Sequence, residues 1–181
     1  MNYYRLTDDF QYAGRWLLGD VLDVDNWMLV SQGGIAGPKE IELCHYGVEL
    51  DFTFSEVYGV PIVSDKVKNI LSGLPGLEFI SVSIVSPISS KNFYIAVVSK
   101  LVDCVDETKS EFRKFEVNDP VRPDKAGQYR GFMHLTLDPS KIAGVDIFRV
   151  AKFQVAIVVS ETIKKSFESV GVTGLGFEQV V

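Results

Sequence analysis

The sequence is poor in the residues from which catalytic and metal sites are most often built. Its 181 residues include two cysteines, Cys44 and Cys104, and two histidines, His45 and His134. Two cysteines are too few for the disulfide framework of a small secreted protein, and both fit a reduced compartment as small core residues. A disulfide between Cys44 and Cys104 stays the alternative to two free thiols.

Long apolar runs are also absent. No stretch approaches the roughly 18 to 20 apolar residues of a membrane-spanning helix, and residues 1–5 contain no apolar segment that would serve as a signal peptide. With 46% apolar and 23% charged residues, the chain is long enough to bury a sizeable core. We therefore expect a cytoplasmic protein that forms a single domain over residues 1–181.

No group of side chains has the spacing of a known catalytic or metal-binding motif. Cys44 and His45 are adjacent, and neighbouring residues of a strand point to opposite faces, which makes joint metal ligation awkward. Asp103 and Asp106 flank Cys104 without a histidine nearby, and they fit a solvated turn. The sequence therefore predicts no catalytic residue, no metal site and no cofactor.

Basic residues are scarce in the first third of the chain. Residues 1–60 hold ten acidic and three basic residues, a net charge of −7, whereas the remainder holds 15 basic and 14 acidic residues. No basic stripe with interleaved aromatic residues occurs, which disfavours nucleic acid and anionic membrane as partners. The acidic field of residues 1–60 would steer a basic protein partner toward them. The alternative is a solvated face that keeps the protein soluble.

Alternation of apolar and polar residues predicts short strands along much of the chain. We expect residues 1–60 to form short strands and turns, beginning with an edge strand at residues 3–6. Residues 41–45 and 52–54 are predicted to be half-buried strands of an antiparallel sheet. Residues 118–129, with two prolines and a glycine, form the clearest loop. Further strands are expected at residues 80–84, 93–98, 133–137, 153–159 and 175–180.

Two similar segments, residues 61–84 and 156–177, each have the pattern of a strand, a helix and a strand. In each, a serine, Ser64 or Ser160, stands at the N-cap position and an acidic residue follows it, which favours a helix start. Similar junctions in any α+β protein are the alternative explanation for the likeness. We predict an α+β fold, mainly antiparallel sheet with a few short helices, two of them in these strand–Ser-capped helix–strand units.

The order and spacing of several motifs resemble a known family. The motifs lie at residues 61–71, 102–110, 137–149 and 159–177. Together they resemble the Imm11 immunity-protein family, formerly a domain of unknown function, well over residues 61–181 and loosely over residues 1–60. Many members of that family are expected to have histidine where this chain has Asp146, so no family role is carried over to that side chain.

The resemblance implies a bacterial immunity protein of a polymorphic-toxin system that is not an enzyme. Such a protein binds and neutralises a cognate toxin by stoichiometric protein–protein interaction. We expect a toxin of basic character, contacted through the acidic N-terminal subregion, residues 1–60. The candidate contact residues are Asp20, Asp23, Asp25, Trp27, Glu40, Glu42 and Tyr46. The oligomeric state stays open.

Two other classes of function remain as alternatives. One is a cytosolic hydrolase or transferase with a site around Asp103, Cys104, Asp106 or His134. Clustering of these groups in one pocket with shifted pKa values would favour it. The other is a ligand-binding or scaffold module, which predicts a large apolar pocket.

Overall fold

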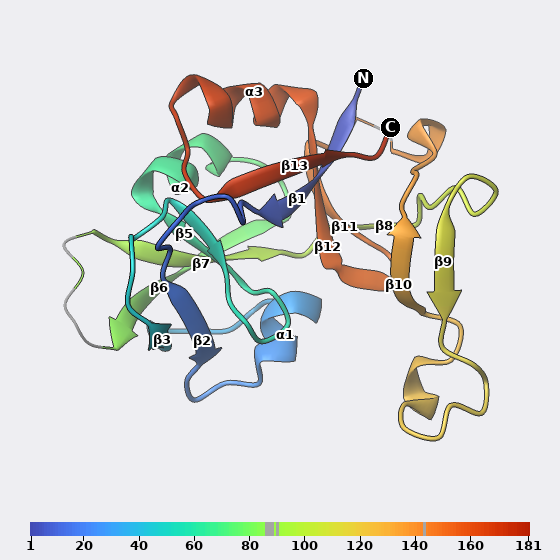
Figure 1. The fold of residues 1–181 in the computed structure, drawn as a ribbon, viewed down its shortest axis with the longest axis horizontal. Coiled ribbons are helices and arrows are strands. Elements are labelled where there is room, and N and C mark those ends of the chain that lie inside the picture. The colour runs from blue at the N-terminus through green and yellow to red at the C-terminus, as the bar shows by residue number, and fades with distance from the viewer. Residues whose placement is uncertain (86–88, 90, 143) are drawn as a thin grey trace.

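The computed structural model describes residues 1–85, 89, 91–142 and 144–181. These residues form three sheets and three α-helices (Figure 1). The elements are β1 (Tyr3–Asp8), β2 (Leu17–Val21), α1 (Asn26–Ser31), β3 (Lys39–His45), β4 (Phe52–Phe54), β5 (Pro61–Ser64), α2 (Asp65–Leu71), β6 (Leu77–Val85), β7 (Phe93–Val98), β8 (Leu101–Val102), β9 (Glu111–Lys114), β10 (Tyr129–His134), β11 (Ile147–Val150), β12 (Phe153–Ser160), α3 (Glu161–Ser169) and β13 (Leu175–Gln179). The predicted α+β class is confirmed.

A six-stranded sheet has the order β2-β3-β6-β7-β5-β4. Most of its pairs are antiparallel, but β3 and β6 run parallel, so the prediction of antiparallel partners for β3 holds on one side only. On one face, residues such as Leu18, Ile62 and Ile95 form a buried core with α1. On the other face, Val63 and Ala96 pack with α2 and α3.

A five-stranded sheet has the order β13-β1-β12-β11-β8. Strand β12 is buried on both faces: Ile157 and Val159 face the core that contains α2 and α3, whereas Ala156 and Val158 face a separate core. This two-sided burial explains the nearly continuous apolar sequence of residues 156–159. The core around α2 and α3 therefore joins the two large sheets.

The first strand lies inside its sheet, and the predicted edge position is wrong. Strand β1 pairs antiparallel with β12 on one side and with β13 on the other. Both partners are near the C-terminus, and a pairing between such distant segments leaves no local signal in the sequence. The same pairing brings the two chain ends close together (Figure 1).

Helix α1 lies where the sequence predicted only strands and turns. Its first turn is closed by Asp25, whose Oδ1 accepts a hydrogen bond from the Trp27 backbone nitrogen at 2.9 Å. The buried Asn26 side chain bonds both the nitrogen and the oxygen of Val21, each at 2.9 Å, and so fixes the preceding acidic turn. A short apolar run fits a strand or a buried helix equally well, which is why periodicity failed here.

Helices α2 and α3 are confirmed, but their N-caps differ. Ser160 Oγ accepts a hydrogen bond from the Ile163 nitrogen at 3.4 Å, as predicted. Ser64 stands at the N-cap of α2 but makes no side-chain cap bond, so that part of the prediction is wrong. Its hydroxyl instead donates to Asp51 Oδ1 at 3.0 Å. This partner lies 13 residues earlier in the chain, so the local sequence around Ser64 does not indicate it.

The likeness between the two units extends further back than predicted. Ser64 donates its backbone N–H to the Asp51 carbonyl at 2.9 Å, and Ser160 donates to the Asp146 carbonyl at 2.9 Å. The Ser160 hydroxyl also donates to Asp146 Oδ1, at 2.6 Å. Asp51 precedes β4 and Asp146 precedes β11, and each of those strands pairs with the strand that ends in the serine. The shared unit is therefore a hairpin clamped by an Asp–Ser pair, followed by a helix and a strand.

The two-stranded sheet of β9 and β10 stands apart from the other sheets (Figure 1). The predicted loop between them is confirmed, with a short 3₁₀ turn at Pro123–Lys125. Strand β10 begins at Tyr129, before the predicted start at residue 133. Among the residues that the structure describes, no helix has the length and apolar character needed to cross a membrane.

Candidate functional site

Three of the predicted contact residues meet on an exposed acidic face formed by β2 and β3. Glu40 and Glu42 are two residues apart on β3 and therefore share one side of the sheet; both are exposed. Asp20 and Glu56 lie close enough to influence Cys44, beside Glu42. Local desolvation and the charges of Glu56, Glu42 and Asp20 raise the pKa of the Cys44 thiol. We call Asp20, Glu40, Glu42 and Glu56 the acidic face.

The remaining predicted residues lie elsewhere. Asp23 is exposed in the turn before α1, with a positive φ of 57°. Asp25 is occupied in capping α1, and Tyr46 is exposed just beyond the end of β3. Trp27 is half-buried and packs with Tyr58, their ring centroids 5.3 Å apart. Lys125 Nζ also lies over the Trp27 ring. Trp27 therefore has a cationic neighbour, unlike the residues of the acidic face.

Glu56 was not among the predicted contacts. Its place follows from a backbone hydrogen bond in which the Glu56 nitrogen donates to the Leu18 carbonyl at 2.8 Å. Glu56 is one of the ten acidic residues in residues 1–60. Because it is far from residues 40–42 along the chain, the sequence did not predict that it lies near them in the fold.

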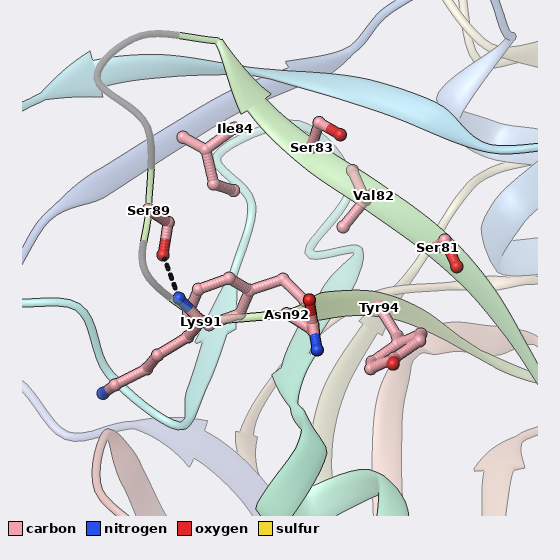
Figure 2. A pocket seen from close by; sticks show the side chains of 9 residues that line it. Ser81, Val82, Ser83, Ile84, Ser89, Lys91, Asn92 and Tyr94 are labelled. Carbon is pink, nitrogen blue, oxygen red and sulfur yellow. Dashed lines mark hydrogen bonds between the residues drawn. The ribbon is translucent and has the colours of Figure 1, made fainter.

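A polar cleft of about 410 Å³ lies on β6 and β7 beside the acidic face (Figure 2). Strand β6 connects the two, because Ser83 pairs with Glu40. The cleft is lined by Ser81, Val82, Ser83, Ile84, Ser89, Lys91, Asn92, Phe93 and Tyr94. Two of its side chains already have partners: Asn92 Nδ2 donates to Asp65 Oδ2 at 3.1 Å, and Lys68 Nζ lies 3.6 Å from the Tyr94 ring centroid. The described lining consists mainly of hydroxyl and amide groups with one lysine, which suits binding of a polar surface.

The carboxylates of the enzyme alternative do gather in one cleft, of about 570 Å³. Asp103 and Asp106 line it together with Glu107 and Asp138. Each has a cationic neighbour, for example Lys152 Nζ at 2.8 Å from Asp103 and Lys114 Nζ at 2.6 Å from Glu107. Hydrogen bonds, from Thr108 to Asp106 and from Lys114 to Glu107, lower the pKa of both acids. These acids stay ionised at neutral pH, whereas a general acid needs a raised pKa.

Cys104 and His134 do not join those carboxylates at the cleft surface. Cys104 is fully buried, and burial raises the pKa of its thiol to about 12, so the thiolate needed for nucleophilic attack is not formed at neutral pH. His134 is exposed, with Nε2 3.1 Å from Thr136 Oγ1. In the described part of the chain, no three His, Cys, Asp or Glu side chains are grouped to hold a metal ion.

The two cysteines are free and differ in exposure, which gives a direct test of the fold. In the native protein, a disulfide-exchange reagent such as DTNB is expected to modify Cys44 and to leave Cys104 unmodified, because Cys104 has no contact with solvent. Native Cys44→Ser protein should therefore release no chromophore, and the same variant in denaturant should release one equivalent. A native Cys44→Ser protein that reacts would contradict the burial of Cys104.

Comparison with known proteins gives one family. The model of the immunity protein family Imm11 matches residues 44–181, which include all of residues 61–181 and the last part of the loosely similar residues 1–60. A search of curated proteins found no match. The matched segment begins on β3 and contains both clamped hairpin–helix–strand units.

Proposed function

The chain belongs to the Imm11 immunity protein family, and from that premise we propose that it neutralises a cognate bacterial toxin by stoichiometric binding. The toxin would belong to a polymorphic-toxin system, and binding would take place in the cytoplasm. We further propose that the acidic face on β2 and β3 makes the first contact with a basic surface of the toxin.

Uncompensated charge is the observation that supports this surface. Among the described residues, no side chain of the acidic face forms an ion pair. Acids elsewhere on the surface are often neutralised, as Asp124 is by Arg122 at 2.7 Å and Glu168 by Lys164 at 2.6 Å. Like charges held together without counter-ions raise the energy of the free protein and favour a cationic partner.

The backbone beneath the acidic face is well ordered by pairing. Strand β3 is hydrogen-bonded to β2 on one side and to β6 on the other. Side chains on such a strand are presented in a nearly fixed arrangement, which lowers the ordering cost of association. The acidic face is therefore suited to rapid encounter with a folded partner.

The proposal is tested first by complex formation. The protein is co-expressed and co-purified with the toxin encoded beside its gene, and we expect a one-to-one complex at micromolar concentration together with rescue of growth. Toxicity that persists despite expression of the folded protein, with no complex at micromolar concentration, would refute the proposed function.

Charge reversal then locates the surface. The double variant Glu40→Lys/Glu42→Lys is expected to slow association with the toxin by about tenfold at low salt and to weaken its salt dependence. The control is Glu111→Lys/Glu116→Lys, which makes the same charge change at exposed positions on and beside β9. Stopped-flow measurement over a range of salt concentrations gives the comparison. Equal slowing in both variants would indicate net charge alone, and unchanged rates would place the interface elsewhere.

A further inference from the structure

A third cleft, of about 420 Å³, lies where three segments distant in sequence meet. Helix α1 contributes one wall, the 3₁₀ turn after β9 a second, and the turn between β11 and β12 a third. The lining residues are Trp27, Ser31, Gln32, Arg122, Asp124, Lys125, Gln128, Lys152 and Gln154. We call this the basic cleft, since it has three cationic side chains and one carboxylate.

Two of the three cations at the basic cleft are neutralised by neighbours. The Arg122 guanidinium makes two hydrogen bonds to Asp124, at 2.9 and 2.7 Å, and Lys152 Nζ bonds Asp103 at 2.8 Å. Lys125 is different, because no carboxylate of the described residues forms an ion pair with it. The basic cleft therefore presents an uncompensated positive charge in a chain of net charge −6.

Lys125 is held in place by aromatic rings. Its Nζ lies 4.5 Å from the Trp27 ring centroid and 6.0 Å from that of Phe115. Partial burial, and then the nearby positive charge of Arg122, lower the pKa of Lys125. The charge of a bound anion would offset both the lost hydration of the ammonium and the repulsion from Arg122, which favours anion binding beside Lys125.

A further unpaired cation is buried behind the lining of the basic cleft. Arg149 has no exposed surface; its Nη1 donates to the Gln154 carbonyl at 2.6 Å and its Nε to the Val98 carbonyl at 3.2 Å. Among the described residues, its Nη2 has no hydrogen-bond partner. Gln154 itself lines the basic cleft. A buried charge is weakly screened by salt, so Arg149 adds to the positive potential there.

The residues that line the basic cleft around Lys125 indicate which class of anion it would bind. Gln32 and Gln128 supply amide donors at the lining of the basic cleft, which suit the oxygens of a carboxylate. The Trp27 ring is engaged by Lys125 and by Tyr58, so it does not offer the open stacking platform that a nucleotide base uses. The basic cleft thus fits carboxylate side chains of a peptide segment better than it fits a nucleotide.

We propose that the basic cleft binds an acidic segment of the toxin, with Lys125 as the principal contact. The identity of this partner rests on the proposed function, whereas the binding of carboxylates does not. Because the acidic face and the basic cleft have opposite charge, a toxin that contacts both can dock in one orientation only. Trp27 then contributes to toxin binding through the basic cleft and not through the acidic face.

A peptide experiment tests the basic cleft without the toxin. Hexaglutamate is titrated into the intact protein at low ionic strength while tryptophan fluorescence is followed. Trp27 is half-buried beside the basic cleft and Trp16 is 2% exposed, so the response should come from Trp27. We expect a saturable change that is absent with hexalysine and absent in Trp27→Phe. The affinity should fall at least about tenfold in Lys125→Gln, with little change in Lys125→Arg or in the exposed control Lys100→Gln.

Titration with the toxin completes the test. Lys125→Glu is expected to weaken toxin affinity by about tenfold or more, whereas Lys100→Glu, with the same charge change, should not. No saturable response to hexaglutamate, or unchanged toxin affinity in Lys125→Glu, would overturn the inference. Hexaglutamate binding by a protein that forms no toxin complex would instead refute the proposed function and leave the carboxylate site in place.

Discussion

Asp51→Ala is expected to lower the free energy of unfolding by about 3 kcal/mol. Asp51 is 6% exposed, and its carboxylate accepts hydrogen bonds from Ser64 Oγ at 3.0 Å, from Lys66 Nζ at 2.8 Å and from both the nitrogen and hydroxyl of Thr173 at 3.1 Å. Removing it leaves several donors without a partner. Because the Lys66 side chain is 43% exposed, the lost ion pair contributes only a small part of this figure.

The second unit provides a matched control. Asp146 occupies the equivalent position and, among the residues that the structure describes, accepts one side-chain hydrogen bond, from Ser160. Asp146→Ala should therefore cost about 1 kcal/mol, clearly less than Asp51→Ala. Urea denaturation followed by circular dichroism measures both. Equal losses would show that the extra contacts to Lys66 and Thr173 add no stability.

The stability gained from Asp51 should also depend on pH. Burial by itself would raise the pKa of the Asp51 carboxyl, but hydrogen bonds from Lys66, Thr173 and Ser64 outweigh it and hold the pKa below its usual value. A carboxyl with a lowered pKa in the folded state stabilises the fold above the unfolded pKa, about 4. That stabilisation is lost as the pH falls from the unfolded pKa through the lower pKa of the folded state. The difference between wild type and Asp51→Ala should thus be constant near neutral pH and shrink below about pH 4.

The same network bears on domain organisation. Through Thr173, Asp51 connects the acidic subregion, residues 1–60, to the turn before β13. We propose that residues 1–181 form a single domain that unfolds in one step. Both tryptophans lie in residues 1–60, whereas α2 and α3 lie outside it. Fluorescence and far-ultraviolet circular dichroism should therefore give coincident transitions, and two separate midpoints would indicate two domains.

Arg149→Ala is expected to destabilise the protein by about 3 kcal/mol. The substitution leaves a cavity in the space of the largest fully buried side chain and removes the donors that satisfy the Val98 and Gln154 carbonyls. A favourable term opposes these losses, because burial lowers the pKa of Arg149 to about 10, which shows that its charge is disfavoured in the fold. The cavity and the unpaired carbonyls are expected to prevail.

Two further variants separate these contributions. Arg149→Met removes the charge but fills most of the volume, so it should cost about 1 kcal/mol. The exposed Arg130→Ala should cost less than about 0.5 kcal/mol. If Arg149→Met were as damaging as Arg149→Ala, lost carbonyl hydrogen bonds rather than the cavity would be the main cause. If Arg149→Ala were stabilising, the uncompensated charge would dominate.

Local signals predicted helices α2 and α3 but failed at contacts between distant segments. The apolar positions of α2 and α3, their serines and their acidic first residues are all within one helix, so the sequence identified both. Helix α1 was missed, since its six residues are too few to show a helical period. On the surface, Glu40 and Glu42 lie two residues apart on β3 and therefore share one side of the sheet. Lys125 was not predicted as a contact residue, because the cleft that it lines forms only when segments distant in sequence come together.

The sequence by itself determined the α+β class, the two serine-led helices, the family and the acidic character of residues 1–60. These properties depend on composition and on spacings of a few residues. Such spacings matter locally because helices and strands place side chains on one face at fixed intervals. Only the tertiary structure decided that β1 lies between β12 and β13, that Ser64 bonds Asp51, and that Trp27 lies against Lys125. Each of these depends on contacts between segments far apart along the chain. Such contacts are chosen by the packing of the whole core rather than by local preference.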